Sequence, residues 1–260
     1  MIETVKKILF SLTVLAVFLA VKPAMAQHYG IMFGDLEVTE ANAGDIFGDG
    51  MASYDYERNM MVLYDGFDYH LSHGLVTIDT GREFRFLLEG DATMVASLES
   101  SDPVIVEAMD KAHLKITSNI SGSALKCKTL SVMPDVFLDL LSRNSQSGMY
   151  ALECTDLTVE RATLYAEVTT ANLAVATDHL TLIGSKLQKP AGGGVNPIWG
   201  GICFADGIPA KIVRIVLDDT GLQEEGLTPV EHVRKIFERG RIVIVKDGKR
   251  YDLSGREIHK

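Results

Sequence analysis

The sequence contains only three cysteines and a single tryptophan in 260 residues. Cys127, Cys154 and Cys203 are odd in number, and their spacing matches neither a disulfide framework nor a zinc site. Two of them fall at matching positions of an internal repeat, which favours a packing role. We therefore expect free thiols.

Familiar catalytic motifs are also missing. The chain has no G-x-S-x-G elbow, no H-E-x-x-H and no P-loop. Of the elements found in parallel β-helix pectin hydrolases, it holds only the pair Asp218-Asp219, which we interpret as a turn. The sequence favours a protein that is not an enzyme.

Basic charge is scarce as well. The formal net charge is −10, and removing residues 1–26, which hold three lysines and one glutamate, makes it −12. An acidic surface argues against nucleic acid and anionic lipid as partners.

The one long apolar run, residues 8–21, is shorter than the roughly 20 residues of a membrane span. A basic start precedes the run, and Ala24-Met25-Ala26 resembles a signal peptidase site. We expect residues 1–26 to be a signal peptide, with no transmembrane segment after cleavage. The chain would then be exported to the periplasm, the cell surface or the medium; an uncleaved anchor is the alternative.

Between residue 75 and about 217 no helical stripe exceeds two turns. Short runs alternate apolar and polar residues instead, as in strands with one buried face. Phe84, Phe86 and Leu88 form one such run. Residues 136–143 could be a short helix or a bulged strand.

These runs repeat along the chain. Residues 124–132, ALKCKTLSV, are echoed by ALECTDLTV at 151–159 and by AVATDHLTL at 174–182. Aligning L-x-(I/V/L) at 114, 130, 157 and 180 gives steps of 16, 27 and 23 residues. Steps of this size suit the coils of a β-solenoid, in which only inward residues need repeat. We expect two inward rows: Leu125, Leu152 and Val175, then Cys127, Cys154 and Thr177.

The predicted fold is therefore all-β: a single-stranded, right-handed parallel β-helix over residues 75–227. Residues 27–74 would form an N-terminal cap and the first strands. A β-sandwich is the alternative, but the stretch has none of the Asn-Gly turns that sandwiches favour.

The last segment, 228–260, differs in pattern. Thr228, Pro229 and Glu231 form a capping box, which predicts a helix over 228–240. A hairpin on Asp247-Gly248 would follow. We expect this helix and hairpin to cap the last coil; an independent sorting or anchoring tail is the alternative.

Residues 34–65 resemble the start of secreted bacterial β-helix proteins described as containing a carbohydrate-binding domain. The shared pattern is V-T-x-x-N-A-x-D-I-x-G-D-G followed by S-Y-D-x-x-x-N, with Met61 replacing the usual first Leu of the next run. The resemblance implies a β-helix and carbohydrate binding.

Exposed aromatic rings beside polar groups can bind sugars. One candidate is the N-terminal cluster with Tyr54, Tyr56, Tyr69 and His70, although these rings could simply cap the first coil. The other is the glycine-rich stretch 189–202, with Trp199 and Asn196. There the tryptophan could instead plug the last coil.

Three acidic residues, Asp45, Asp49 and Asp55, lie within 11 positions and could supply oxygen ligands to Ca²⁺. Turn formation by Asp and Gly is the alternative. No other cofactor is indicated. The leading prediction for function is non-catalytic binding of a glycan or cell-surface component. The alternatives are a polysaccharide-acting lyase or glycoside hydrolase and a purely structural protein.

Overall fold

The computed structural model describes residues 27–119, 122–143, 149–169 and 173–218, and the strand segments 234–238, 241–246 and 249–251. Side chains are described up to residue 218, except those of residues 72 and 73. The chain divides into two compact units, Met1–Asp218 and Asp219–Lys260. All regular secondary structure in the described residues consists of β-strands.

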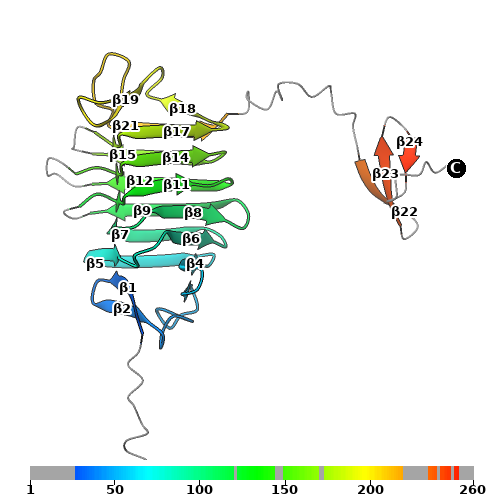
Figure 1. Ribbon diagram of the computed structural model, residues 1–260, viewed down its shortest axis with the longest axis horizontal. Helices are drawn as coiled ribbons and strands as arrows, with labels where there is room; N and C mark the ends of the chain where they lie inside the picture. Colours follow the sequence, from blue (N-terminus) through cyan, green and yellow to red (C-terminus); the bar gives the residue numbers. More distant parts are fainter. Residues whose placement is uncertain are drawn as a thin grey trace, which may run out of the picture. The chain divides into compact units, whose positions relative to one another are not determined.

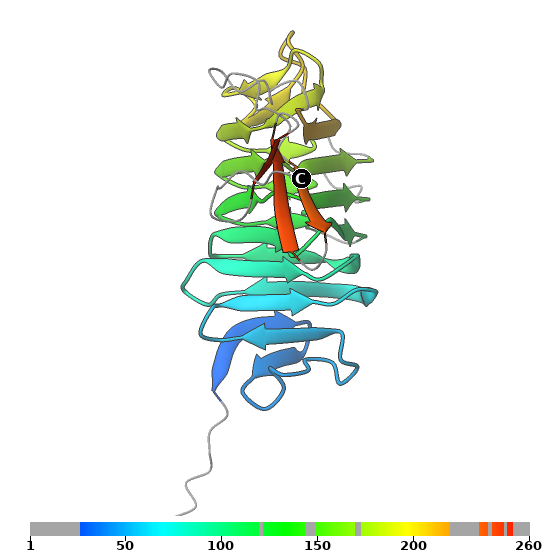
Figure 2. The ribbon, with the colours of Figure 1, turned by 90° about the vertical axis from the view of Figure 1, so that its right-hand side faces the viewer.

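The first unit is a parallel β-helix of about five turns, as predicted. Figures 1 and 2 show its strands stacked in successive layers. Each turn passes through three walls. The first wall consists of β3 (Ala52–Asp55), β4 (Met60–Leu63), β6 (Phe84–Leu88), β8 (Val104–Ala108), β11 (Thr129–Val132), β14 (Asp156–Glu160) and β17 (His179–Ile183).

The second and third walls belong to one continuous sheet, because two long strands run through both. The second wall consists of β5 (Phe67–Ile78), β7 (Ala92–Ser100), β9 (Ala112–Ser118), β12 (Val136–Ser142), β15 (Thr163–Val168), β21 (Ile212–Leu217) and β18 (Ser185–Lys189). The third wall continues from β5 and β7 into β10 (Leu125–Lys126), β13 (Leu152–Glu153), β16 (Val175–Ala176), β20 (Gly201–Cys203) and β19 (Gly194–Asn196).

The alternating pattern of the sequence produces a core between the walls. Phe84, Phe86 and Leu88 of β6 are buried, whereas the side chains between them are half-buried. Parallel pairing places Phe84 on Val104, so inward residues of successive turns stack in rows. Full burial of one such side chain contributes about 1.5–3 kcal/mol.

The repeated letters mark two inward rows, as predicted. Leu125 pairs with Leu152, and Leu152 pairs with Val175. In the neighbouring row Cys127 and Cys154 are buried free thiols. The Cys154 sulfur lies 3.8 Å from the hydroxyl of the buried Thr177.

One step of the repeat alignment is wrong. The steps of 27 and 23 residues are confirmed by the pairing of Leu157 with Leu130 and with Leu180. Leu114, however, lies in β9 of the second wall, and the partner of Leu130 on the preceding turn is Val104. Two walls share the same apolar spacing, so the alignment joined strands of different walls. Of residues 136–143, which the sequence leaves open between a helix and a strand, Val136–Ser142 form the strand β12.

Antiparallel strands end the stack on both sides. At the start, β1 (His28–Phe33) pairs with β5 and with β2 (Leu36–Thr39), and β3 pairs with β4. At the other end, β21 covers β15 and β20 covers β16. Parallel pairing begins at Met60, before the predicted start at residue 75. These strands cover sheet edges that would otherwise expose unpaired backbone groups.

The second unit contains a small antiparallel sheet. The predicted hairpin is confirmed, since β23 (Arg241–Lys246) pairs with β24 (Lys249–Tyr251). The predicted helix over 228–240 is wrong in its described part, because β22 (Arg234–Glu238) is a strand paired with β23. The first residues of that helix lie outside the described ones. That the tail closes the last coil stays a prediction.

The buried thiols should make the protein less stable in alkali. Burial raises the pKa of Cys154 from its usual 9.0 to about 12, and also raises that of Cys127. Above pH 9 an unfolded chain releases these protons while the folded chain keeps them. The free energy of unfolding should therefore fall by up to about 1.4 kcal/mol per pH unit for each thiol.

Denaturant unfolding of the wild type and of Cys154→Ala between pH 9 and 12 measures this loss. The stability of the variant should decline less steeply with pH. Its remaining decline comes from the other groups whose pKa is raised in the folded protein: Cys127, Cys203, Tyr54, Tyr69 and Tyr165. Equal slopes would contradict the inward position of Cys154.

Candidate functional site

Trp199 lies in the turn of the hairpin formed by β19 and β20. The backbone N–H of Gly200 donates to the carbonyl of Asn196 (2.9 Å), and that of Ile198 donates to the Asn196 side-chain oxygen (2.9 Å). These bonds define the turn while the Trp199 side chain remains 54% exposed. Trp199 therefore does not fill the interior of the last coil. Asn196 uses its amide oxygen in the turn, which leaves the amide NH₂ group as a donor for a ligand.

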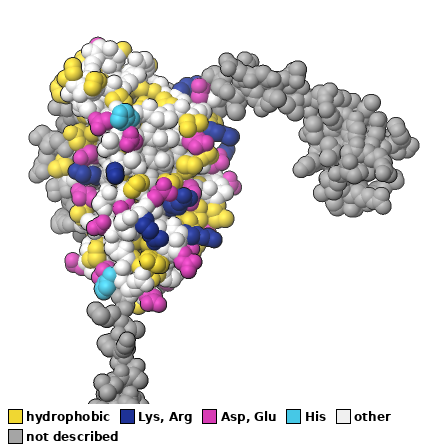
Figure 3. Space-filling view, viewed as in Figure 1, with side chains coloured by type: hydrophobic (Ala, Val, Ile, Leu, Met, Phe, Trp, Pro, Cys, Tyr) yellow, Lys and Arg dark blue, Asp and Glu magenta, His cyan; other side chains and the backbone are white. Residues whose placement is uncertain are grey.

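Other apolar side chains are exposed close to this turn. Ile198 is 87% exposed, and Phe204 and Ile208 are exposed in the next turn. The two turns adjoin, since Gly207 lies against the Asn196 amide. In Figure 3 the end of the solenoid that carries β19 shows mainly hydrophobic and uncharged side chains, whereas charged ones are spread over the coils. Exposed apolar patches of this kind mark interaction surfaces.

The N-terminal aromatic cluster divides into buried and exposed members. Tyr54 is only 6% exposed, so its ring is not available to stack on a sugar. Tyr69 is half-buried, and its ring lies 5.2 Å from that of Phe33 and 4.9 Å from that of Phe47. For these two tyrosines the capping interpretation is correct, because they pack at the start of the solenoid.

Tyr56 and His70 are exposed but already have partners. The Tyr56 ring stacks on Tyr29 with a centroid distance of 4.9 Å. The Arg82 guanidinium lies 5.0 Å from the same ring and donates to the Tyr56 carbonyl (2.6 Å). The His70 Nε2 lies 2.9 Å from Asp68 Oδ1. Tyr56 is thus a less open platform than Trp199.

The acidic residues proposed for Ca²⁺ form turns. Asp45 Oδ1 accepts three backbone N–H groups, from residues 48, 49 and 50. Asp49 accepts from Met51, and Asp55 accepts from residues 57 and 58. Among the described residues no group of three or more His, Cys, Asp or Glu side chains could hold a metal ion. The turn interpretation is the one that the geometry supports.

An outward row on the second wall brings together titratable side chains that are far apart in the sequence. Pairing places Asp139 between Lys115 and Tyr165, and Tyr165 beside Arg214. Burial raises the pKa of the Asp139 carboxyl, opposed by Lys115 and His113. The pKa of Tyr165 rises to about 12, first because its hydroxyl donates to Glu167 (2.6 Å) and then because of burial.

The sequence alone does not predict this row. Its members lie on different turns and share no letter pattern, because outward positions are free to differ. Only the register of β9, β12 and β15 reveals that they are neighbours, and that register follows from the inward leucines Leu114, Leu138 and Leu164.

No protein-family model, curated protein or solved structure matches the chain. The part of the chain that the structure describes holds no helix of a length and apolarity suited to crossing a membrane. The resemblance of residues 34–65 to secreted β-helix proteins, and the carbohydrate binding it implies, stay predictions. The predicted signal peptide, residues 1–26, lies outside the described residues, so export stays a prediction as well.

Proposed function

We propose that this protein is an exported, non-catalytic β-solenoid that binds a glycan or another cell-surface component at its Trp199 end. The observation that carries this proposal is the exposed Trp199 ring on a hydrogen-bonded turn. A large solvent-exposed ring on an ordered turn buries much apolar area on binding, and little conformational entropy is lost because the turn is already fixed. A soluble monomer gains nothing for its own stability from an indole left in water.

The ring can stack on the apolar face of a sugar, and the neighbouring Asn196 NH₂ group can donate to a hydroxyl. Ile198, Phe204 and Ile208 extend the contact surface around it. The turn connects β19 and β20, the last two strands at this end of the sheet.

Since Trp199 is the only tryptophan, its fluorescence reports on this site alone. Titration of the purified protein with a binding oligosaccharide should shift the emission. Trp199→Ala should weaken binding, measured by calorimetry, by about tenfold or more. The melting temperature should stay nearly unchanged, because surface substitutions alter stability by about 0.5 kcal/mol or less.

Ile198→Ala is the matched control, since it removes a more exposed apolar side chain from the same turn and should reduce affinity less. Unchanged affinity in Trp199→Ala would contradict the proposal. The outward row of Lys115, Asp139 and Tyr165 supports the alternative, an enzyme that acts on polysaccharides. Release of new reducing ends or unsaturated products in the same titration would favour that alternative over simple binding.

A further inference from the structure

A shallow groove of about 330 Å³ lies on the side of the solenoid, where β9, β12 and β15 begin. Its size is near the lower end of small-molecule sites, which are about 300–1,000 Å³. The lining residues include Lys111, His113, Asp135, Phe137, Arg161 and Thr163. None of them belongs to the Trp199 turn.

An interrupted aromatic stack borders this groove. Phe137 lies flat on His113, with ring centroids 4.4 Å apart and planes 10° from parallel. The two residues pair in register on successive turns, and the next residue in the same outward row is Thr163. Because Thr163 is small, the stack stops after two rings. Phe137 has one face on His113 and is still 39% exposed.

The charged groups of the groove balance. Lys111 and Arg161 contribute two positive charges, and Asp91 and Asp135 contribute two negative ones. Asp91 accepts the backbone N–H of His113 (3.0 Å). Among the described residues, the side chains of Lys111, Asp135 and Arg161 have no ion pair or hydrogen bond with one another or with neighbours. They are available to a ligand as two donors and one acceptor.

We propose that this groove binds one ring of a neutral glycan, stacked on Phe137 above Thr163. The sugar ring would continue the aromatic stack where the next turn offers only a threonine. Its hydroxyls would accept from Lys111 and Arg161 and donate to Asp135. An acidic sugar would face two carboxylates and an amino sugar would face two cations, so the balanced charges select a neutral ring. The site does not depend on the one at Trp199.

Thr163→Phe tests the proposal, because the new ring would occupy the place of the sugar. Thr158→Phe is the matched control: it makes the same substitution at a half-buried outward threonine of the same turn, on the first wall. Both are made in the Trp199→Ala protein, so that the hairpin turn contributes no binding. Calorimetry then measures cellohexaose, laminarihexaose, mannohexaose and an oligogalacturonate of equal length.

We expect at least one neutral hexasaccharide to bind the Thr158→Phe protein, and Thr163→Phe to weaken that binding by at least about tenfold. Equal affinity in the two variants, tighter binding of the oligogalacturonate, or no neutral binding at all would overturn the proposal. Phe137→Leu, which keeps an apolar side chain, should give the same loss if Thr163→Phe does not fold. Failure of the Trp199 site appears separately, as an absent fluorescence shift in the wild type.

Discussion

Cys127→Asp should lower the free energy of unfolding by about 3–5 kcal/mol, because it places an uncompensated charge in the core. Cys127 is 7% exposed, and its neighbour in the inward row is another buried thiol, Cys154. Against a total stability of about 5–15 kcal/mol, such a loss removes a large part of the folded population at ambient temperature. Chemical denaturation at pH 7 measures it.

Cys127→Ser separates charge from shape. Serine is slightly smaller and polar, so it should cost about 1–2 kcal/mol. Lys128→Asp places the same carboxylate one position further along, on an exposed side chain, and should change stability little. A melting curve for Cys127→Asp that matches the wild type would contradict the inward register of this row.

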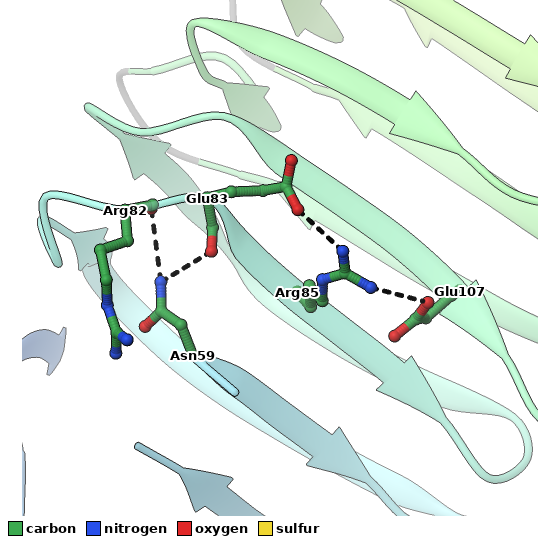
Figure 4. A network of polar contacts seen from close by, with 5 residues as sticks. All are labelled: Asn59, Arg82, Glu83, Arg85 and Glu107. Carbon is green, nitrogen blue, oxygen red and sulfur yellow. Dashed lines mark hydrogen bonds and ion pairs between the residues drawn. The ribbon is translucent and has the colours of Figure 1, made fainter. Parts of the chain in front are cut away.

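Asn59→Ala should cost about 3 kcal/mol, because one buried amide holds several groups. The side chain is 2% exposed, and its oxygen accepts from the Tyr54 hydroxyl. Its nitrogen donates to the hydroxyl of Thr80 (2.8 Å) and to the carbonyls of Arg82 (3.3 Å) and Glu83 (2.8 Å). Figure 4 shows the amide directed at these two carbonyls. Asn59 also has a φ of 51°, a left-handed conformation that asparagine tolerates better than alanine.

Two further variants isolate the cause. Asn59→Asp keeps the shape and the acceptor for Tyr54 but loses both donors, so it should be destabilised comparably to alanine. Arg85→Gln removes the ion pairs of Arg85 with Glu83 (2.9 Å) and Glu107 (3.6 Å), also drawn in Figure 4. Glu83 is exposed and the other two groups are only half-buried, so water still screens these pairs and the loss should be about 1 kcal/mol or less. Equal effects of Asn59→Ala and Arg85→Gln in denaturant unfolding would contradict the role assigned to the buried amide.

The inward rows could be predicted because burial imposes a pattern on the sequence. Leu125, Leu152 and Val175 were found from spacing alone, and they pair as expected. The same principle produced the wrong step at Leu114. Inward positions carry the same kinds of apolar residue on every wall. Spacing therefore reveals the turns of the solenoid but does not show which wall a strand belongs to.

In the tail, local helix signals in the sequence led to the wrong prediction. Residues 228–240 carry good helix signals, yet Arg234–Glu238 pairs with Arg241–Lys246. The partner reads R-I-V-I-V-K, a β-branched run that favours strands. A neighbouring strand that satisfies every second backbone group can override local helix propensity. Capping residues favour the start of a helix locally, but they do not reveal whether another strand pairs with the segment.

The candidate sites depended on exposure, which spacing does not determine. Trp199 and Tyr54 are both candidates in the sequence, but a hairpin turn leaves Trp199 in water while β3 packs Tyr54 against the core. The stack of Phe137 on His113 was invisible because outward residues follow no repeat. Its detection required the register of the second wall.

Glycan binding itself is tested most directly by a glycan array probed with the wild type and with the double variant Trp199→Ala/Thr163→Phe. We predict that the wild type is retained by neutral oligosaccharides and that the folded double variant is not. A wild type that no glycan retains, or a double variant that binds the same glycans equally well, would contradict a glycan-binding role and favour a purely structural one.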